Sequence, residues 1–224
     1  MQKTLEIACF NFQSATDAAE SGADRIELCE NYSEGGVTPA ACLLSEVIDS
    51  VNIPVFCMIR PRSGNFVYSE NEVQLMKEQI EFSKSIGCKG VVFGVLTEDF
   101  NINKTICKQL VELAHPLECT FHRAFDAADD IHKALEDIIA CGFKRILTSG
   151  QAKTASEGKD IIKQLVELAN GRISIMPGGS IRSNTIKMLA QYTGAVEFHS
   201  AAITGTSAFA DKSEIKQLVQ ELKN

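Results

Sequence analysis

The sequence contains no run of basic residues. Its 22 lysines and arginines are outnumbered by 29 acidic residues, which gives the 224-residue chain a net charge of -7. Proteins that bind a nucleic-acid backbone or an anionic membrane surface usually present clustered positive charge. We therefore expect neither nucleic acid nor a membrane among the partners of this protein.

Long apolar stretches are missing as well. No segment approaches the roughly 20 apolar residues that span a bilayer, and the N-terminal residues MQKTLE lack the apolar core of a signal peptide. With 45% hydrophobic and 23% charged residues, the composition is typical of a soluble globular protein. We therefore expect a cytoplasmic protein.

The eight cysteines include no pair at the C-x-x-C spacing, so a zinc ribbon and a thioredoxin-type redox pair are unsupported. A reducing cytosol keeps such thiols free. Six of them fall in predicted helices, at helix ends or at helix-facing strand positions, where cysteine packs as a small hydrophobe: Cys42, Cys57, Cys88, Cys107, Cys119 and Cys141. The other two, Cys9 and Cys29, end the first two predicted strands.

Short apolar runs of strand length alternate with amphipathic segments of helix length from residue 4 onward. The predicted strands are residues 4–9, 25–29, 54–60, 90–95, 117–122, 145–148, 172–176 and 196–199. Helices between them begin at capping residues, such as Ser69 with Glu72, and end at glycines such as Gly142 and Gly194. Strict alternation predicts a parallel sheet, and eight closed units form a compact (β/α)8 TIM barrel, a single domain over residues 1–224.

A doubly wound open sheet is the alternative fold, because it has the same alternation of strands and helices. Its first β-α turn commonly carries a glycine fingerprint for a dinucleotide, and residues 9–14 contain no glycine. Connections of about six residues leave no room for a second domain. The sequence therefore favours the closed barrel.

Titratable side chains occur at strand positions that should face the inside of the barrel. Alternate residues of a barrel strand point inward, and chemistry gathers at the C-terminal strand ends. Alternation sends five such residues inward: Glu6, Glu27, Arg60, His122 and Glu197. Buried charges must be paired. The ring therefore predicts either a ligand site or a salt-bridge layer that holds the barrel together.

The loops after the predicted third and seventh strands offer groups that suit an anion. Arg60 and Arg62 flank a rigid proline, and two guanidinium groups can hold a carboxylate or a phosphate. Gly178 and Gly179 let backbone N–H groups approach an anion, and His199 ends the eighth strand, where barrels often bind phosphate. Surface arginines and a plain Gly-Gly turn are the alternative interpretations.

Cys9 and Cys29 could ligate a soft ion such as Cu(I), because both end adjacent strands at the functional rim. Strand alternation complicates this pair. If Glu6 points inward, Ala8 does too, and Cys9 then points toward the helices unless the strand ends early or bulges. A two-cysteine site therefore requires a local change of the backbone.

Six segments occur in one order along nearly the whole chain: GADRIELC at 22–29, EGGVTP at 34–39, IRPRSGNFVY at 59–68, TFHRAFD at 120–126, ILTSG at 146–150 and MPGG at 176–179. In this order they closely resemble the CutC family of copper-homeostasis proteins. The resemblance implies a cytoplasmic (β/α)8 barrel that takes part in copper tolerance, binds copper and is often a homo-oligomer. It implies Cys9 and Cys29 as the Cu(I) ligands. Six polar residues also lie within the family motifs: Glu27, Arg60, Arg62, His122, Arg123 and Asp126.

Two functions are consistent with these observations. The first is copper handling, with Cu(I) held by Cys9 and Cys29. The second is that of an enzyme, or a former one, acting on a small anionic metabolite that carries a carboxylate or a phosphate. Glu27 and His122 would then exchange protons with the metabolite. The residues expected to bind it are Arg60, Arg62, Arg123, Asp126, Gly178, Gly179 and His199.

Overall fold

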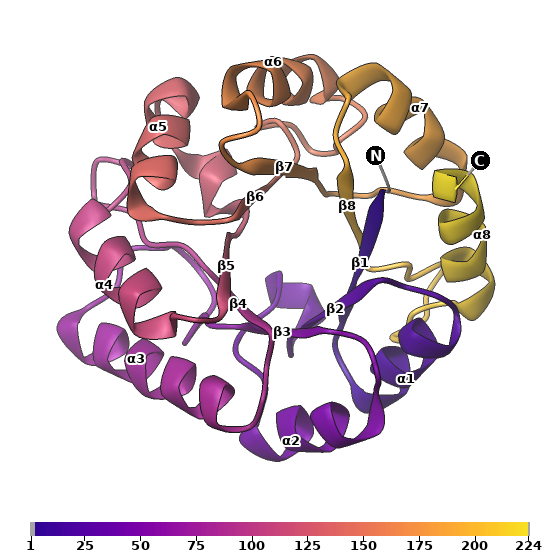
Figure 1. Cartoon of the computed structure of the whole chain (residues 1–224), viewed down its shortest axis with the longest axis horizontal. Helices are drawn as coiled ribbons and strands as arrows, with labels where there is room; N and C mark the ends of the chain where they lie inside the picture. Colours follow the sequence, from indigo (N-terminus) through magenta and orange to yellow (C-terminus); the bar gives the residue numbers. More distant parts are fainter. Residues whose placement is uncertain (1–2, 224) are drawn as a thin grey trace.

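Strands and helices alternate along residues 3–223, which a computed structural model of the protein describes (Figure 1). The strands are β1 (Thr4–Cys9), β2 (Arg25–Leu28), β3 (Val55–Met58), β4 (Gly90–Phe93), β5 (Glu118–Phe121), β6 (Arg145–Thr148), β7 (Ser174–Pro177) and β8 (Glu197–Ser200). The helices are α1 (Phe12–Glu20), α2 (Ala41–Ser50), α3 (Glu70–Ser85), α4 (Lys104–Ala114), α5 (Ile131–Cys141), α6 (Lys159–Ala169), α7 (Ser183–Thr193) and α8 (Lys212–Lys223). Two short 3-10 helices, η1 (Tyr32–Glu34) and η2 (Arg123–Ala127), follow β2 and β5.

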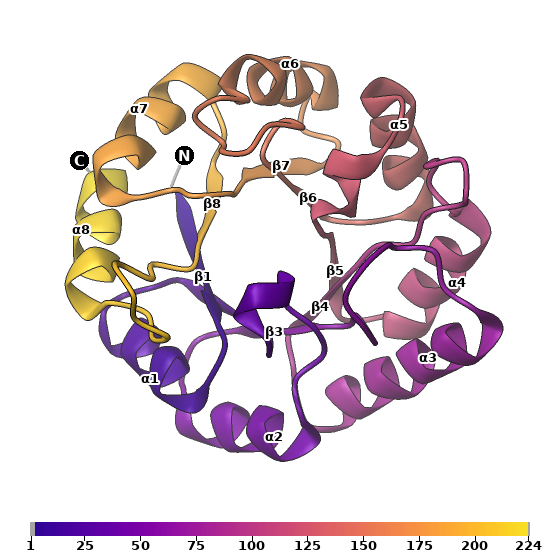
Figure 2. The ribbon, with the colours of Figure 1, turned by 180° about the vertical axis from the view of Figure 1, so that it is seen from behind.

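Every ladder between neighbouring strands is parallel. The strand order is β7-β6-β5-β4-β3-β2-β1-β8, so the first and last strands of the chain are neighbours and the barrel is nearly closed. Figures 1 and 2 show the helices as a ring around the strands. The predicted (β/α)8 barrel is confirmed, and the open-sheet alternative is wrong. Among the helices of residues 3–223, none has both the length and the hydrophobicity required to span a bilayer.

Local sequence signals account for several helix ends. The Ser69 hydroxyl accepts from the Glu72 N–H and the Glu72 carboxylate accepts from the Ser69 N–H, which forms the predicted capping box of α3. Helices α5 and α7 end at Gly142 and Gly194, whose φ angles of 91° and 74° lie in the left-handed region. These ends fix where each chain segment turns back toward the next strand.

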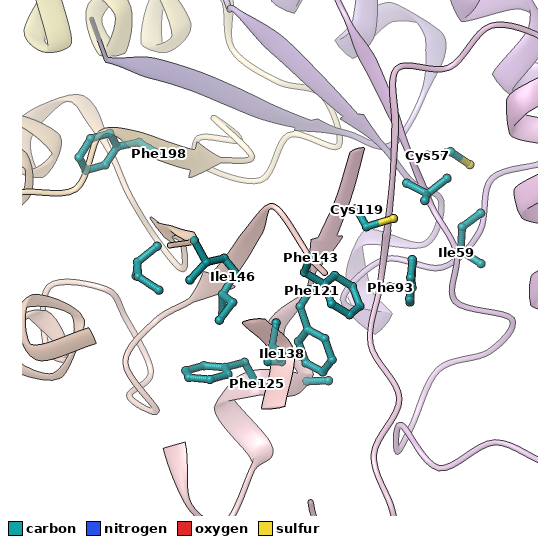
Figure 3. Packing of buried hydrophobic residues seen from close by; sticks show 14 of the residues in the cluster. Cys57, Ile59, Phe93, Cys119, Phe121, Phe125, Ile138, Phe143, Ile146 and Phe198 are labelled. Carbon is teal, nitrogen blue, oxygen red and sulfur yellow. The ribbon is translucent and has the colours of Figure 1, made fainter. Parts of the chain in front are cut away.

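Apolar side chains form two clusters, one on each side of the barrel wall. The larger cluster fills the space between the strands and the helices, and Figure 3 shows Phe93, Phe121 and Phe143 packed within it. Cys57 and Cys119 belong to the same cluster, as predicted (Figure 3). The smaller cluster is built from residues of the opposite strand parity: Cys29, Phe56, Met58 and Val92.

Ion pairs fill the interior at the N-terminal end of the barrel. Arg25 donates to Glu6 and also to Glu197, from Nη2 at 2.7 Å. Glu197 accepts from Arg145 Nε as well, at 3.0 Å. The guanidinium carbons of both arginines lie over the ring of Phe56, 4.8 and 5.0 Å from its centroid. The salt-bridge interpretation of the inward-facing ring therefore holds for Glu6 and Glu197.

Candidate functional site

A cavity of about 260 Å³ lies at the C-terminal ends of the strands. The segment between β2 and α2, which supplies Tyr32 and Gly35 to its lining, crosses the centre of the ring (Figure 2). The polar and charged side chains that line the cavity are Glu27, Tyr32, Arg60, His122, Arg123, Lys153, Ser180, Arg182, His199 and Ser200. They include four lysine or arginine side chains against one carboxylate, so the cavity is locally positive on a chain whose net charge is -7.

Arg60 is a buried cation without a carboxylate partner among residues 3–223. It lies two residues beyond the end of β3 and is only 6% exposed. Its guanidinium donates to the backbone carbonyls of Glu34 and Gly36, both at 2.9 Å, and to that of Gly64 at 3.0 Å. No described residue accepts a hydrogen bond from its Nε. These carbonyls fix the guanidinium in place but do not neutralise its charge, so the site favours an anion.

His122 is held as a neutral ring with one nitrogen available. The residue follows β5, is 3% exposed, and its Nδ1 accepts from the Ala124 N–H at 3.2 Å. Burial, together with the nearby positive charge of Arg60, lowers the pKa of His122 to about 3. Because Nδ1 is an acceptor, the ring proton belongs on Nε2, which has no partner among the described residues. His122 can therefore donate one hydrogen bond to a ligand.

Glu27, His199 and Glu6 form a chain of titratable groups. His199 Nδ1 lies 2.8 Å from Glu6 Oε1, and His199 Nε2 lies 3.5 Å from Glu27 Oε2. Glu27 Oε1 is buried and has no partner within residues 3–223. Ligating atoms of these three residues lie within 4.8 Å of one another. Both Glu6 oxygens and His199 Nδ1 are already engaged, so we interpret the group as a hydrogen-bonded network.

The pKa values of the three groups are shifted in different directions. Burial raises the pKa of Glu6, but Arg25 and His199 outweigh burial and lower it to about 2. Burial raises the pKa of Glu27. Burial opposes the charged form of His199, yet Glu27 and Glu6 outweigh it and raise its pKa. Glu6 therefore stays ionised and orients His199, while Glu27, whose pKa is raised, is the carboxyl of the two that takes up a proton more readily.

Asp126 organises the loop after β6 and does not line the cavity. Its carboxylate accepts from the Thr148 hydroxyl and from the N–H groups of Ser149, at 3.1 Å, and Gln151, at 3.2 Å. It also pairs with Arg123 Nε at 2.8 Å. Arg123 lines the cavity and donates through Nη2 to the Ser149 hydroxyl at 2.7 Å. Asp126 therefore acts on the site by positioning Arg123 and this loop.

The predicted site residues separate into two groups. Six of them line the cavity: Glu27, Arg60, His122, Arg123, Gly179 and His199. Arg62 turns away and donates to Glu72 and to carbonyls of its own loop, including Val67 at 2.7 Å. Gly178 lies behind the lining, where a Cβ would come within 2.4 Å of Leu147 Cδ1. Arg62 and Gly178 therefore shape the loops around the cavity.

Sequence reasoning missed five polar residues of the lining. Tyr32 lies in the 3-10 helix η1 after β2, and Ser200 ends β8. Lys153 comes from the loop between β6 and α6, while Ser180 and Arg182 come from the loop between β7 and α7. Their position in β-α loops was the available signal, but a basic residue in a loop is commonplace. At the opposite end of the barrel, Arg25 and Arg145 were missed as well, although Arg25 has the same strand parity as Glu27.

Cys9 and Cys29 lie on opposite sides of the barrel wall. Cys9 belongs to the helix-facing cluster, and its thiol lies 3.6 Å from the Ile7 carbonyl. Cys29 belongs to the cluster inside the barrel together with Met58, and its thiol lies 3.5 Å from Glu27 Oε2. Burial, followed by the charge of Glu27, raises the pKa of both thiols. A shared Cu(I) ion would therefore require one side chain to move and both thiols to lose a proton.

Known proteins that are similar to this chain agree in family and fold. The model of the CutC family matches residues 3–204. A human protein named copper homeostasis protein cutC homolog is 48% identical over 198 residues, covering 88% of this chain and 72% of that protein. A CutC family protein of Histophilus somni is 44% identical over 200 residues, covering 89% of this chain and 82% of its own length.

Solved structures extend the comparison. CutC from Streptococcus agalactiae superposes with a TM-score of 0.85 at 34% identity, covering 91% of this chain and all of that one. A phosphoribosylanthranilate isomerase from Thermotoga maritima, at a TM-score of 0.67 and 13% identity, covers 99% of each chain and shares the fold alone. With its family model matched over most of its length, the chain belongs to the CutC family.

Proposed function

We propose that this protein binds a small anionic metabolite in the cavity at the C-terminal strand ends and transfers a proton on it. The observation that carries the proposal is Arg60, a guanidinium that is 6% exposed and is fixed by three carbonyls without a carboxylate partner among the described residues. An unpaired buried charge is costly, and an anionic ligand would offset that cost. Positive residues around the cavity would also attract anions from solution.

Two groups of the lining suit proton transfer. Glu27 Oε1 has no hydrogen-bond partner among the described residues, and the pKa of Glu27 is raised toward the neutral range, where a general base or acid works best. The Nε2–H of neutral His122 would donate a hydrogen bond to an oxygen on which negative charge develops. His199 and Glu6 do not need to touch the ligand, because their role is to orient Glu27 and stabilise its charge.

Substitution of Arg60 by lysine tests the binding step. We expect the variant to bind small carboxylates or phosphomonoesters about 10- to 100-fold more weakly, because a lysine cannot retain the charge-assisted hydrogen bonds of the fixed guanidinium. Isothermal titration calorimetry of the wild type, Arg60→Lys and the surface control Arg172→Lys measures this loss. Failure of both ligand classes to bind the wild type would contradict the proposed function.

We also propose that the protein takes part in copper homeostasis in the cytoplasm, the role stated in the names of its relatives. More specifically, we propose that Cys9 and Cys29 bind Cu(I) as cargo. The observation in favour is that the two residues are neighbours, because the Cys29 N–H donates to the Cys9 carbonyl at 2.9 Å. Their thiols do not form a ready pair, and the soft donor that shares a cluster with Cys29 is the thioether of Met58.

Cu(I) competition titrations with a chelator under reducing conditions test the copper proposal. If Cys9 and Cys29 hold the ion together, Cys9→Ser and Cys29→Ser each weaken binding strongly, because a hydroxyl is a poor ligand for Cu(I). The exposed Cys42 gives a matched control, and Cys42→Ser should bind copper like the wild type. If Cys29→Ser and Met58→Leu lost Cu(I) affinity while Cys9→Ser bound copper normally, the copper site would lie inside the barrel, at Cys29 and Met58. Unchanged affinity in a Cys9/Cys29 double variant would exclude the cysteine pair.

A further inference from the structure

We infer that the anionic metabolite is a small phosphate monoester, whose phosphoryl group binds the loops after β6, β7 and β8. This inference rests on the proposed function and specifies its substrate class. It places the phosphoryl group beside Gly179, Ser180 and Ala201, with Lys153 and Arg182 as counter-charges, all of which line the cavity. The rest of the molecule extends toward Arg60, which lines the same cavity from the β3 end.

Backbone donors are present on this side of the cavity. The N–H groups of Gly179, Ser180 and Ala201 donate to no acceptor in the part of the chain that the structure describes. Gly179 and Ser180 follow one another with φ angles of 104° and 57°. A side chain at Gly179 would place its Cβ 3.1 Å from Ser149 Cβ, so glycine permits the close approach of this backbone to the loop after β6. Successive backbone N–H groups in a turn can form a concave site that suits phosphate oxygens.

Two cations next to these donors, Arg182 and Lys153, have no acidic partner within residues 3–223. Arg182 is braced by the carbonyls of Ile181, at 2.8 Å, and Ile203, at 2.7 Å, and forms no ion pair with a described carboxylate. Lys153 makes neither a hydrogen bond nor an ion pair with any described residue, although it lines the cavity. Arg123 differs, because Asp126 already neutralises it. Two unpaired cations match a phosphate monoester, which carries about -1.5 to -2 charges at pH 7, better than a single carboxylate.

Cavity size limits the rest of the molecule. At about 260 Å³ the space is slightly smaller than the range of roughly 300–1,000 Å³ that is usual for ligand pockets, which favours a short phosphorylated compound over a nucleotide. A second polar end is required, because Arg60, His122 and Glu27 line the same cavity. A carbonyl or hydroxyl oxygen would accept from the Nε2–H of His122 and leave Glu27 as the proton acceptor.

Calorimetric titrations with glycerol 3-phosphate, glycerate and inorganic phosphate test this inference. We expect glycerol 3-phosphate to bind at least about tenfold more tightly than glycerate, which matches it in carbon number but carries a carboxylate. Inorganic phosphate should bind more weakly than glycerol 3-phosphate, because it leaves the second polar end unfilled. Lys153→Ala should weaken the binding of glycerol 3-phosphate about tenfold. The exposed side chain makes no hydrogen bond or ion pair within residues 3–223, so its removal breaks none. Lys163→Ala, on the outer helix α6, is the control and should leave the affinity for glycerol 3-phosphate unchanged.

Four outcomes would overturn the inference. Equal binding of glycerate and glycerol 3-phosphate, or full affinity in Lys153→Ala, would remove the phosphate assignment while leaving the proposed anion site in place. Equal affinity for inorganic phosphate would show an ion subsite without a metabolite. Absence of binding by all three compounds would overturn the inference and the proposed function together.

Discussion

Replacing Arg25 by methionine is expected to lower the free energy of unfolding by about 3–5 kcal/mol, the usual cost of breaking a buried ion pair from one side. Arg25 joins Glu6 to Glu197 in the barrel interior, and Glu6 is completely buried. Methionine fills much of the same volume but leaves Glu6 with His199 as its remaining partner. Urea unfolding followed by circular dichroism gives the free energy for the variant and the wild type.

The pH dependence of this loss identifies Glu6 as its source. In the folded protein the pKa of Glu6 is lowered from 4.5 to about 2, so its contribution to stability is present above pH 4.5 and is lost as the pH falls toward 2. The difference in free energy of unfolding between the wild type and Arg25→Met should therefore become smaller as the pH falls from 4.5 to 2. Arg172→Met, which breaks the exposed pair with Glu136, should change stability little at any pH. If the difference in free energy of unfolding between the wild type and Arg25→Met were as large at pH 2 as at pH 7, the loss would arise from packing instead.

The direction of side chains within strands could be predicted from the sequence. A period of two residues places Glu27 inside the barrel and Cys57 against the helices, and both positions are confirmed. The same rule placed Cys9 toward the helices, because β1 continues without a bulge from Thr4 to Cys9 and pairs Cys9 with Leu28. Strand alternation is reliable here because each strand is covered by helices on one side and encloses the interior on the other.

Loop geometry could not be predicted in the same way. Arg60 and Arg62 are two residues apart, yet the first lines the cavity and the second pairs with Glu72 on the next helix. Ser180 has a φ of 57°, which its residue type does not signal. Lys153 reaches the cavity because contacts distant in sequence fix its loop, including the bond from the Ala155 N–H to the Gly179 carbonyl, at 3.0 Å. The conformations of these loops therefore depend on contacts that form only in the assembled barrel.

Replacing Glu27 by glutamine is expected to slow proton transfer on a bound metabolite by about 10²–10⁴-fold, the usual contribution of a general acid or base. Glutamine preserves the size and an acceptor oxygen of Glu27 but cannot take up a proton. Dihydroxyacetone phosphate is a suitable probe, because it combines a phosphate with an acidic carbon next to a carbonyl. Proton NMR in D₂O would follow loss of its carbon-bound hydrogens with the wild type, Glu27→Gln and the exposed control Glu70→Gln.

The same variant should not lose stability, which separates a functional carboxylate from a structural one. Burial raises the pKa of Glu27 above its usual 4.5, so folding favours the protonated form, and that contribution is lost as the pH rises through the raised value. Glutamine mimics the protonated form at every pH. Glu27→Gln should therefore be at least as stable as the wild type at pH 7. Below pH 4.5 the two proteins should have similar free energies of unfolding. A variant that is clearly less stable at pH 7 while exchange persists at the wild-type rate would place Glu27 in the structural layer with Glu6.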